Sequence, residues 1–382
     1  MSSGSQERVT YKEESVWGDY GTGTLKEFPH TGITGQQGSS FFTSRIVRAD
    51  RRTQDISRGT FGAALTLPFE LLYRGTKNGL DDFFKYALQD SAWSTPENDV
   101  TGAATNDDTV TKTGAFNSAN WAVGNLVRLT LSTGAKSVHV ITAKSNDALT
   151  VSPDGIIVDA NTTVEHETCI VDGTTVKSVC LERNFRDVGE KSLYPGAEVN
   201  TFDLAVSTNG PVSGSFGLMA KIEDDDTASM GDPVGANVMS TNRVFDSVGH
   251  LDGFWFGTTL TQRYFVDSRL SLSNGIVARE VCGVEGYESL RNGSISLRGD
   301  FNCYFSSNSE LSAYKANTEV QILFSFTDSY GNTYAVYMPS AVVTACARNG
   351  GGKDTDVRVG TSYEAKAHAT YDYTLKIARW DA

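Results

Sequence analysis

Side chains that could carry chemistry are few and scattered along the chain. The closest approach to a metal-binding cluster is Glu165, His166 and Glu167, and the whole sequence holds five histidines. In an extended strand the two glutamates would point to one face and the histidine to the other, which is poor chelating geometry. The sequence also lacks a nucleophile elbow, a His-Glu-x-x-His helix and a phosphate-binding P-loop. We therefore predict no catalytic, metal or cofactor site and no enzyme, although a glycosidase-type carboxylate pair stays open.

A basic segment lies within residues 41–58, where five arginines face only two aspartates. Two interpretations are open: a contact with nucleic acid, or ion pairs between a strand edge and a neighbouring subunit. Aromatic residues do not interleave these arginines and the whole chain is anionic, so the second interpretation is favoured. The candidate inter-subunit residues are Arg45, Arg48, Arg51, Arg52 and Arg58.

An acidic run follows an apolar strand near the middle of the chain. It consists of Glu223, Asp224, Asp225 and Asp226. A divalent-cation loop is one interpretation, but the spacing does not match an EF-hand and no glutamate closes the loop. The run is otherwise a solvated loop or part of an acidic wall, and we keep the four residues as candidates for either position.

The composition bounds the class of protein. The chain has 382 residues, with 33 Lys and Arg against 46 Asp and Glu, giving a net charge of −13. This balance argues against a sequence-reading nucleic-acid binder and against docking on anionic membranes. Abundant glycine (37) and scarce proline (8), together with many Thr, Val, Tyr and Phe, indicate a mainly β protein with many turns.

Alternating apolar residues predict the strands that organise the chain. Odd positions from Phe61 to Leu71 are apolar, and apolar residues then recur at helical spacing from Leu80 to Leu88. The same order returns weakly near the other end, where Arg298-Gly299-Asp300-Phe301 repeats the Arg-Gly-x-Phe entry and residues 308–316 resemble a short helix. Either two β domains share this pattern by chance or one domain has been duplicated.

Shifts in composition suggest the boundaries of the domains. We predict an extended arm over residues 1–40, because this segment is polar and rich in Gly and Thr. A first β domain is expected to be discontinuous, with a small β module spliced into it. A long loop then leads to a second domain. The predicted ranges are 41–98 and 172–226 for the first domain, 99–171 for the inserted module, 227–249 for the loop and 250–382 for the second domain.

Several segments together resemble a known family. An Arg-rich strand pair leads into Gly-x-Phe-x-x-x-Leu-x-x-Pro-Phe-Glu-Leu, and a Leu-Asp-Asp-Phe-Phe helix follows. Later segments read Val-Gly-Asn-Leu-Val, Ser-Val-Cys-Leu-Glu-Arg-Asn-Phe, Pro-Gly-Ala-Glu-Val-Asn and Val-Ser-Gly-Ser-Phe-Gly-Leu-Met. The chain thus resembles the tail tube (major tail) proteins of long-tailed, non-contractile bacteriophages, well over residues 35–225 and more loosely over 250–382.

The resemblance implies tandem tube-type β-sandwich or barrel domains, each with a short flanking helix, and a virion protein that stacks in rings around a channel for DNA. It implies a tape measure protein and tail terminator or tip proteins as partners, transient non-specific passage of DNA, and assembly in the host cytoplasm. With two tube domains per chain, we expect three chains per ring with pseudo-sixfold symmetry. The alternatives are a ring of six chains, and a β-rich decoration or adhesin module that binds carbohydrate or a host surface.

Overall fold

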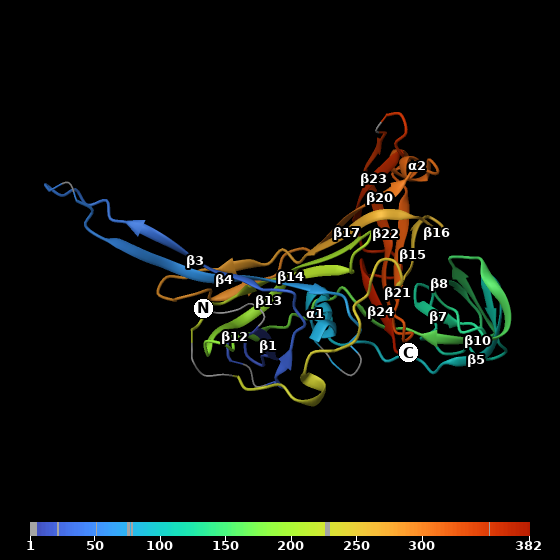
Figure 1. Ribbon diagram of the computed structural model, residues 1–382, viewed down its shortest axis with the longest axis horizontal. Helices are drawn as coiled ribbons and strands as arrows, with labels where there is room; N and C mark the ends of the chain where they lie inside the picture. The colour runs from blue at the N-terminus through green and yellow to red at the C-terminus, as the bar shows by residue number, and fades with distance from the viewer. Residues whose placement is uncertain are drawn as a thin grey trace.

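The computed structural model describes residues 6–20, 23–50, 52–74, 77, 79–225, 230–350 and 352–382. Eight antiparallel strands form one continuous sheet, which we call the eight-stranded sheet (Figure 1). Its strands in spatial order are β3 (Thr34–Thr43), β4 (Ile56–Glu70), β14 (Ser213–Ala220), β13 (Glu190–Ser207), β17 (Phe265–Ser273), β20 (Ser296–Tyr304), β23 (Arg358–Ala365) and β22 (Thr333–Asn349).

Two long strands, β13 in the first half and β22 in the second, begin in a second layer and end in this sheet. The first part of β13 pairs with β12, and the first part of β22 pairs with β21 and, on its other side, with β24. The second-layer strands of the first half are β12 (Val179–Phe185), β1 (Glu7–Glu13) and β2 (Lys26–Glu27). Those of the second half are β21 (Glu319–Thr327), β15 (Leu251–Gly257), β16 (Thr261–Gln262), β24 (Lys376–Trp380) and β11 (Thr168–Val171).

The order of strands and the pattern of pairing occur twice in the chain. In both halves, the chain first forms two second-layer strands, then a long hairpin, then a short helix. Three further strands then return the chain to the sheet. The hairpin strands β3 and β4 correspond to β17 and β20, and helix α1 (Gly79–Leu88) corresponds to α2 (Ser309–Ala316). Likewise β12, β13 and β14 correspond to β21, β22 and β23. Such agreement favours duplication over chance resemblance.

The registers show which residues are equivalent in the two halves. A bulge interrupts the β13–β14 pairing at Asn200 and the β22–β23 pairing at Thr344. Counting along the ladders from these bulges makes Leu67 of β4 equivalent to Phe301 of β20. The two Arg-Gly-x-Phe segments of the sequence are therefore not equivalent, because Phe61 lies six residues before Leu67 on β4.

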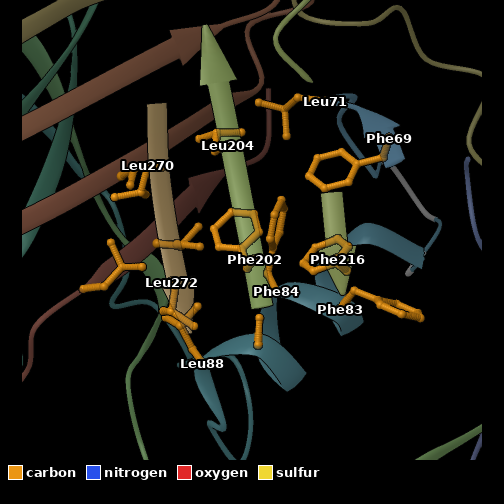
Figure 2. Close-up of a cluster of buried hydrophobic side chains, with 14 of the residues drawn as sticks. Phe69, Leu71, Phe83, Phe84, Leu88, Phe202, Leu204, Phe216, Leu270 and Leu272 are labelled. Atoms are coloured by element: carbon orange, nitrogen blue, oxygen red, sulfur yellow. The ribbon is translucent and has the colours of Figure 1, made fainter. Parts of the chain in front are cut away.

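The core of the first half lies between the eight-stranded sheet and α1. Phe216 stacks on Phe69 with ring centroids 4.9 Å apart and on Phe202 at 5.3 Å. Figure 2 shows Phe84 and Leu88 of α1 on the same side of the sheet as Phe202 of β13 and Leu272 of β17. The apolar alternation seen in the sequence thus buries an aromatic cluster, and this burial stabilises the fold.

The N-terminal segment differs from its prediction as an extended arm. Residues 7–13 form β1, in which Val9 and Tyr11 are buried, and Phe28 is fully buried in the same core. Only two apolar residues of this strand face the core, and charged residues stand on either side of them. The polar composition of the segment therefore did not indicate a core strand. The structure thus makes β1 and Phe28 part of the core and gives the extended position to the hairpin β3–β4.

A small closed barrel is inserted between α1 and β12. Its own core includes Phe116, Trp121 and Ile141. Around the barrel the strand order is β10-β5-β6-β9-β8-β7. The bounds are β5 (Val100–Asp107), β6 (Thr109–Thr111), β7 (Leu126–Thr130), β8 (Lys136–Lys144), β9 (Ala148–Ser152) and β10 (Ile156–His166). The mainly β class with short flanking helices and an inserted barrel is thereby confirmed.

The barrel packs on the second half, although it is inserted into the first. Leu126, Val138 and Val140 share an apolar cluster with Tyr337 and Trp380. Lys376 Nζ lies 2.6 Å from Glu167 Oε1, and the two side chains are only 3% and 1% exposed. Arg128 donates hydrogen bonds to the carbonyl oxygens of Gly331 and Asp381 at 2.7 and 2.6 Å. These contacts fix the barrel to β22 and β24.

The remaining elements are short. A hairpin of β18 (Val277–Arg279) and β19 (Ser289–Arg291) lies between β17 and β20, and one 3-10 turn, η2 (Gly235–Asn237), lies between β14 and β15. In the described part of the chain, no helix has the length and apolar character of a transmembrane segment.

The buried ion pair of Lys376 and Glu167 yields a stability prediction. Lys376→Met leaves the Glu167 carboxylate buried without its partner, so we expect a loss of about 3–5 kcal/mol in the free energy of unfolding. Adding Glu167→Gln removes the stranded charge and should recover most of that loss. Urea unfolding of the dilute chain measures both variants; equal stability of the single and double variants would contradict this account.

A buried carboxyl on β13 yields a pH prediction. Burial, and then the nearby Glu14 carboxylate, raise the pKa of Glu198 from its ordinary 4.5 to about 7. The folded state therefore favours the protonated acid, so stability falls as pH rises from 4.5 towards 7. Glu198→Gln should flatten that slope and stabilise the fold at pH 8 by about 1–3 kcal/mol. Melting curves at pH 5 and pH 8 test this, and an unchanged slope would refute it.

Candidate assembly surfaces

The three residues that came closest to a metal-binding cluster in the sequence form ion pairs and hydrogen bonds within the fold. Glu165 pairs with Arg128 and accepts a hydrogen bond of 2.9 Å from the Thr130 hydroxyl. Glu167 pairs with Lys376, and the ring nitrogens of His166 lie 3.0 Å from the carbonyl oxygens of Glu167 and Asn120. Among the described residues, no three His, Cys, Asp or Glu side chains gather as a set of metal ligands.

The two outer strands of the eight-stranded sheet leave backbone groups open. β3 pairs with β4 on one side, and in the described residues no strand pairs with its other side. The second part of β22, beyond Val342, pairs with β23 alone. Unpaired edges of this length are normally covered or paired, because each exposes a row of hydrogen-bonding groups. Both ends of the sheet are therefore candidate contact surfaces.

One face of the eight-stranded sheet is polar and carries charges of both signs. Along β13, even positions from Phe202 to Val206 are buried while odd positions point away from the core, and the same alternation runs through β17, β20 and β23. Arg269 pairs with Asp203 at 3.1 Å and Arg298 with Glu364 at 3.4 Å. Charged residues of this face include Glu70, Asp203, Asp267, Arg269, Arg298, Asp300, Arg358 and Glu364, and Arg58 stands at the same alternate positions near the start of β4.

The charge balance of this polar face is slightly acidic. Its carboxylates outnumber its arginines, and within the described strands it carries no lysine. Burial, and then the negative charge of Asp267, raise the pKa of Asp300 above its ordinary value. A shallow hollow of about 650 Å³ lies on this face, lined by Arg269, Arg298, Asp300 and Glu364 among others. The face presents ion-paired guanidinium groups rather than a continuous cationic surface.

The hairpin of β3 and β4 extends far from the body of the protein (Figure 1). Its outer part, residues 41–58, is exposed on both faces, and its apolar side chains include Phe41, Phe42, Ile46, Val47 and Ile56, each more than 60% exposed. A two-stranded ribbon is at best marginally stable in water without packing. The exposed apolar side chains therefore mark this outer part as a second contact surface.

The predicted arginine cluster lies on this hairpin. Arg48 pairs with Asp50 at 3.0 Å, and Arg58 pairs with Glu285 at 3.3 Å, both within one chain. Arg45 and Arg52 are exposed, and the described residues offer them no ion-pair partner. Arg51 lies outside the described residues. Two members of the predicted group thus have partners within the chain, and the role of the group between subunits stays a prediction.

The acidic run lies beyond the end of β14, beside the second layer of the first half. Asp224 forms an isolated bridge with Leu193, and its carboxylate accepts a hydrogen bond of 2.5 Å from Tyr20. Glu223 accepts one of 2.8 Å from Tyr194. Asp225 is exposed, and Asp226 lies outside the described residues. None of the three described residues belongs to a strand of the polar face.

Sequence reasoning missed the charged residues of the polar face and the apolar side chains of the hairpin. Asp203, Asp267 and Asp300 stand at alternate positions within apolar strands, and that alternation was the available signal. Phe41 and Phe42 lie among polar residues, and the interpretation of this segment rested mainly on its arginines. Neither signal says which of two solvent-facing surfaces is the functional one.

Comparison with known proteins agrees with this architecture. A family model described as "Phage tail tube protein" matches residues 4–374, which covers both halves and the inserted barrel. No curated protein matches the chain significantly. Because the family match spans nearly the whole length, the chain belongs to the phage tail tube protein family and is a structural component of the phage tail.

Proposed function

We propose that this protein assembles into rings that stack as the phage tail tube, with the eight-stranded sheet forming the wall of a central channel. The observation that carries the proposal is that, among the described residues, no strand pairs with the outer edge of β3 or with β22 beyond Val342. Edge strands of a cyclic assembly can satisfy one another, so closure of a ring removes the exposed edges that a single chain retains.

Three chains per ring is the arrangement that the fold supports best. The second half continues the sheet of the first half through the pairing of β13 with β17. In a six-chain ring the second half would have to decorate the outside, which its place in the same sheet disfavours. If each half occupies one of six similar positions, three chains close the ring with pseudo-sixfold symmetry.

The polar face of the sheet is the proposed channel surface. The opposite face is covered by α1 and its aromatic core, so the polar face is left to meet solvent. Its slight acidic excess repels phosphate, and its arginines are partly neutralised by Asp203 and Glu364. DNA can then pass without binding, since strong non-specific binding requires cationic groups that contact many phosphates.

The rest of the chain has proposed positions outside the channel. The inserted barrel packs on the second-layer strands and so belongs on the outer surface. The outer part of the β3–β4 hairpin is proposed to contact the next ring. A tape measure protein in the channel and terminator or tip proteins at the ends complete the assembly, which forms in the host cytoplasm. Family membership disfavours the alternative of a carbohydrate-binding adhesin.

Electron microscopy of the purified protein tests the proposal. We expect hollow, striated tubes at high concentration, with three chains per repeat in averaged end views. Six chains per ring would overturn the trimer while leaving the tube intact. Discrete single chains at every concentration, under conditions where the native tail is stable, would refute tube assembly itself.

The hairpin yields a separate prediction. Phe41→Asp combined with Phe42→Asp should leave each chain folded, because both side chains are more than 60% exposed. If they pack between rings, losing about 2–3 kcal/mol of apolar burial raises the concentration needed for tube formation by about tenfold or more. Sedimentation across a concentration series measures that threshold.

Val158→Asp is the matched control, since this exposed valine lies on the inserted barrel. It should leave the threshold unchanged. Equal thresholds for the hairpin variant and the unmodified protein would remove the hairpin from the contact between rings.

A further inference from the structure

The two open edges of the eight-stranded sheet have counterparts inside the chain. In the first half, β13 pairs with β12 as far as Ala197 and then, from Thr201 onward, with β17 of the second half. In the second half, β22 pairs with β21 as far as Val342. Beyond that point the corresponding edge meets no further strand among the described residues. The position that β17 fills beside β13 is therefore empty beside β22.

The strand that would fill this position can be identified from the repeat. β3 corresponds to β17, because each is the first strand of its half's long hairpin and pairs with β4 or β20. The free edge of β3 corresponds to the edge of β17 that contacts β13. We propose that β22 pairs with β3 of a second copy of this chain, in the register that β13 and β17 adopt within one chain. This proposal rests on the proposed ring and specifies its joint.

The register follows from the two bulges. Asn200 and Thr344 interrupt equivalent ladders, so Asp203, three residues beyond the first, is equivalent to Ala347, three residues beyond the second. Ser271 pairs with Arg298, and Gln36 pairs with Ala64.

Ala64 and Arg298 are themselves equivalent, since they pair with the equivalent residues Met219 and Glu364. Gln36 is therefore equivalent to Ser271. Within the chain Asp203 stands opposite Ser271. The copied register places Ala347 opposite Gln36 of the next copy, and Arg348 opposite its Gly35.

The side chains on both faces fit this register. On the polar face, Ala347 and Gln36 are exposed and uncharged, so no like charges meet. On the other face, Arg348 lies 4.7 Å over the Phe305 ring and donates a 2.6 Å hydrogen bond to Asn308. Its proposed neighbour Gly35 has no side chain, which leaves room for the arginine stem. A Cβ at Gly35 would also lie 3.1 Å from the Tyr194 hydroxyl oxygen.

The joint between chains is more polar than the joint within the chain. Inside the chain, Phe202 stands opposite Leu272 and Leu204 opposite Leu270, and Arg269 pairs with Asp203 across the joint. Between chains, the equivalent facing pairs are Cys346 with Gln37 and Arg348 with Gly35. Thr34 and Ala347, which correspond to the ion-paired Arg269 and Asp203, are both uncharged. The internal joint is thus suited to form during folding, while the joint between chains forms on assembly and relies mainly on backbone hydrogen bonds.

A disulfide test reads the register directly. Hydrogen bonds from Asn274 N to Asn200 O and from Thr208 N to Val266 O mark the even positions of β13 as hydrogen-bonded pairs. Asp203 with Ser271, and by equivalence Ala347 with Gln36, are therefore non-hydrogen-bonded pairs. Their Cα atoms should be roughly 4.5 Å apart, within the range that a disulfide spans.

The experiment uses full-length chains carrying Gln36→Cys and Ala347→Cys, with Cys346→Ser to remove the natural thiol beside the site. After assembly and mild oxidation, we expect crosslinked dimers and trimers on a non-reducing gel. The matched control, Gln36→Cys with Ala345→Cys in the same background, is shifted by two residues on the same face. It should give about tenfold less product, because its Cα atoms lie too far apart for a disulfide.

The outcomes separate this joint from the function on which it rests. If the control pair crosslinks as well as the test pair, or if neither pair crosslinks in assembled tubes, the proposed register is wrong while tube assembly stands. An unmodified protein that never assembles refutes the proposed function instead. If the cysteine variants alone fail to assemble, a density map of unmodified tubes decides: Ala347 and Gln36 of adjacent copies must be opposite each other, and any other partner for Ala347 overturns the proposal.

Discussion

The arrangement of the whole chain depends on the backbone pairing of β13 with β17. This ladder of residues 201–207 with 267–273 is the joint through which two similar halves become one sheet. Its core side carries Phe202 and Leu272, and its polar side carries the Arg269–Asp203 ion pair. Because buried and edge backbone groups must find partners, the pairing fixes how the halves are related. The hydrogen-bonding groups left over at β3 and β22 follow from that relation.

Helix α1 packs on the core face of the sheet and contacts both halves of the chain. The Asp81 carboxylate accepts a hydrogen bond of 2.6 Å from Tyr334 of β22, and it pairs with Arg74 and with Arg379 of β24. Asp82, one residue on, accepts hydrogen bonds from Tyr11 at 2.8 Å and Lys26 at 2.5 Å. Acidic groups in the first turn also favour the positive end of the helix dipole. One helical turn thus contacts both halves of the chain through buried, charge-assisted bonds.

Much of the fold could be predicted from local pattern, and the failures have identifiable causes. The alternation from Phe61 to Leu71, the following helix and the inserted barrel are as expected, because period and turn chemistry are local signals. β1 was missed, since its apolar face is only Val9 and Tyr11. The relation of the halves was misaligned by the Arg-Gly-x-Phe motif, because equivalence is set by strand registers that no single motif encodes. The contact surfaces depend on which edges stay unpaired, and that is known only once every strand has its partner.

The attachment of the inserted barrel has a consequence for experiment. Because Lys376, Arg128 and the cluster around Trp380 hold the barrel against β22 and β24, it cannot tumble independently of the second half. A rigid dye bonded at two points on the barrel's far surface would keep a constant angle to the protein frame. Polarised fluorescence from such a dye would then report torsion of an intact tail.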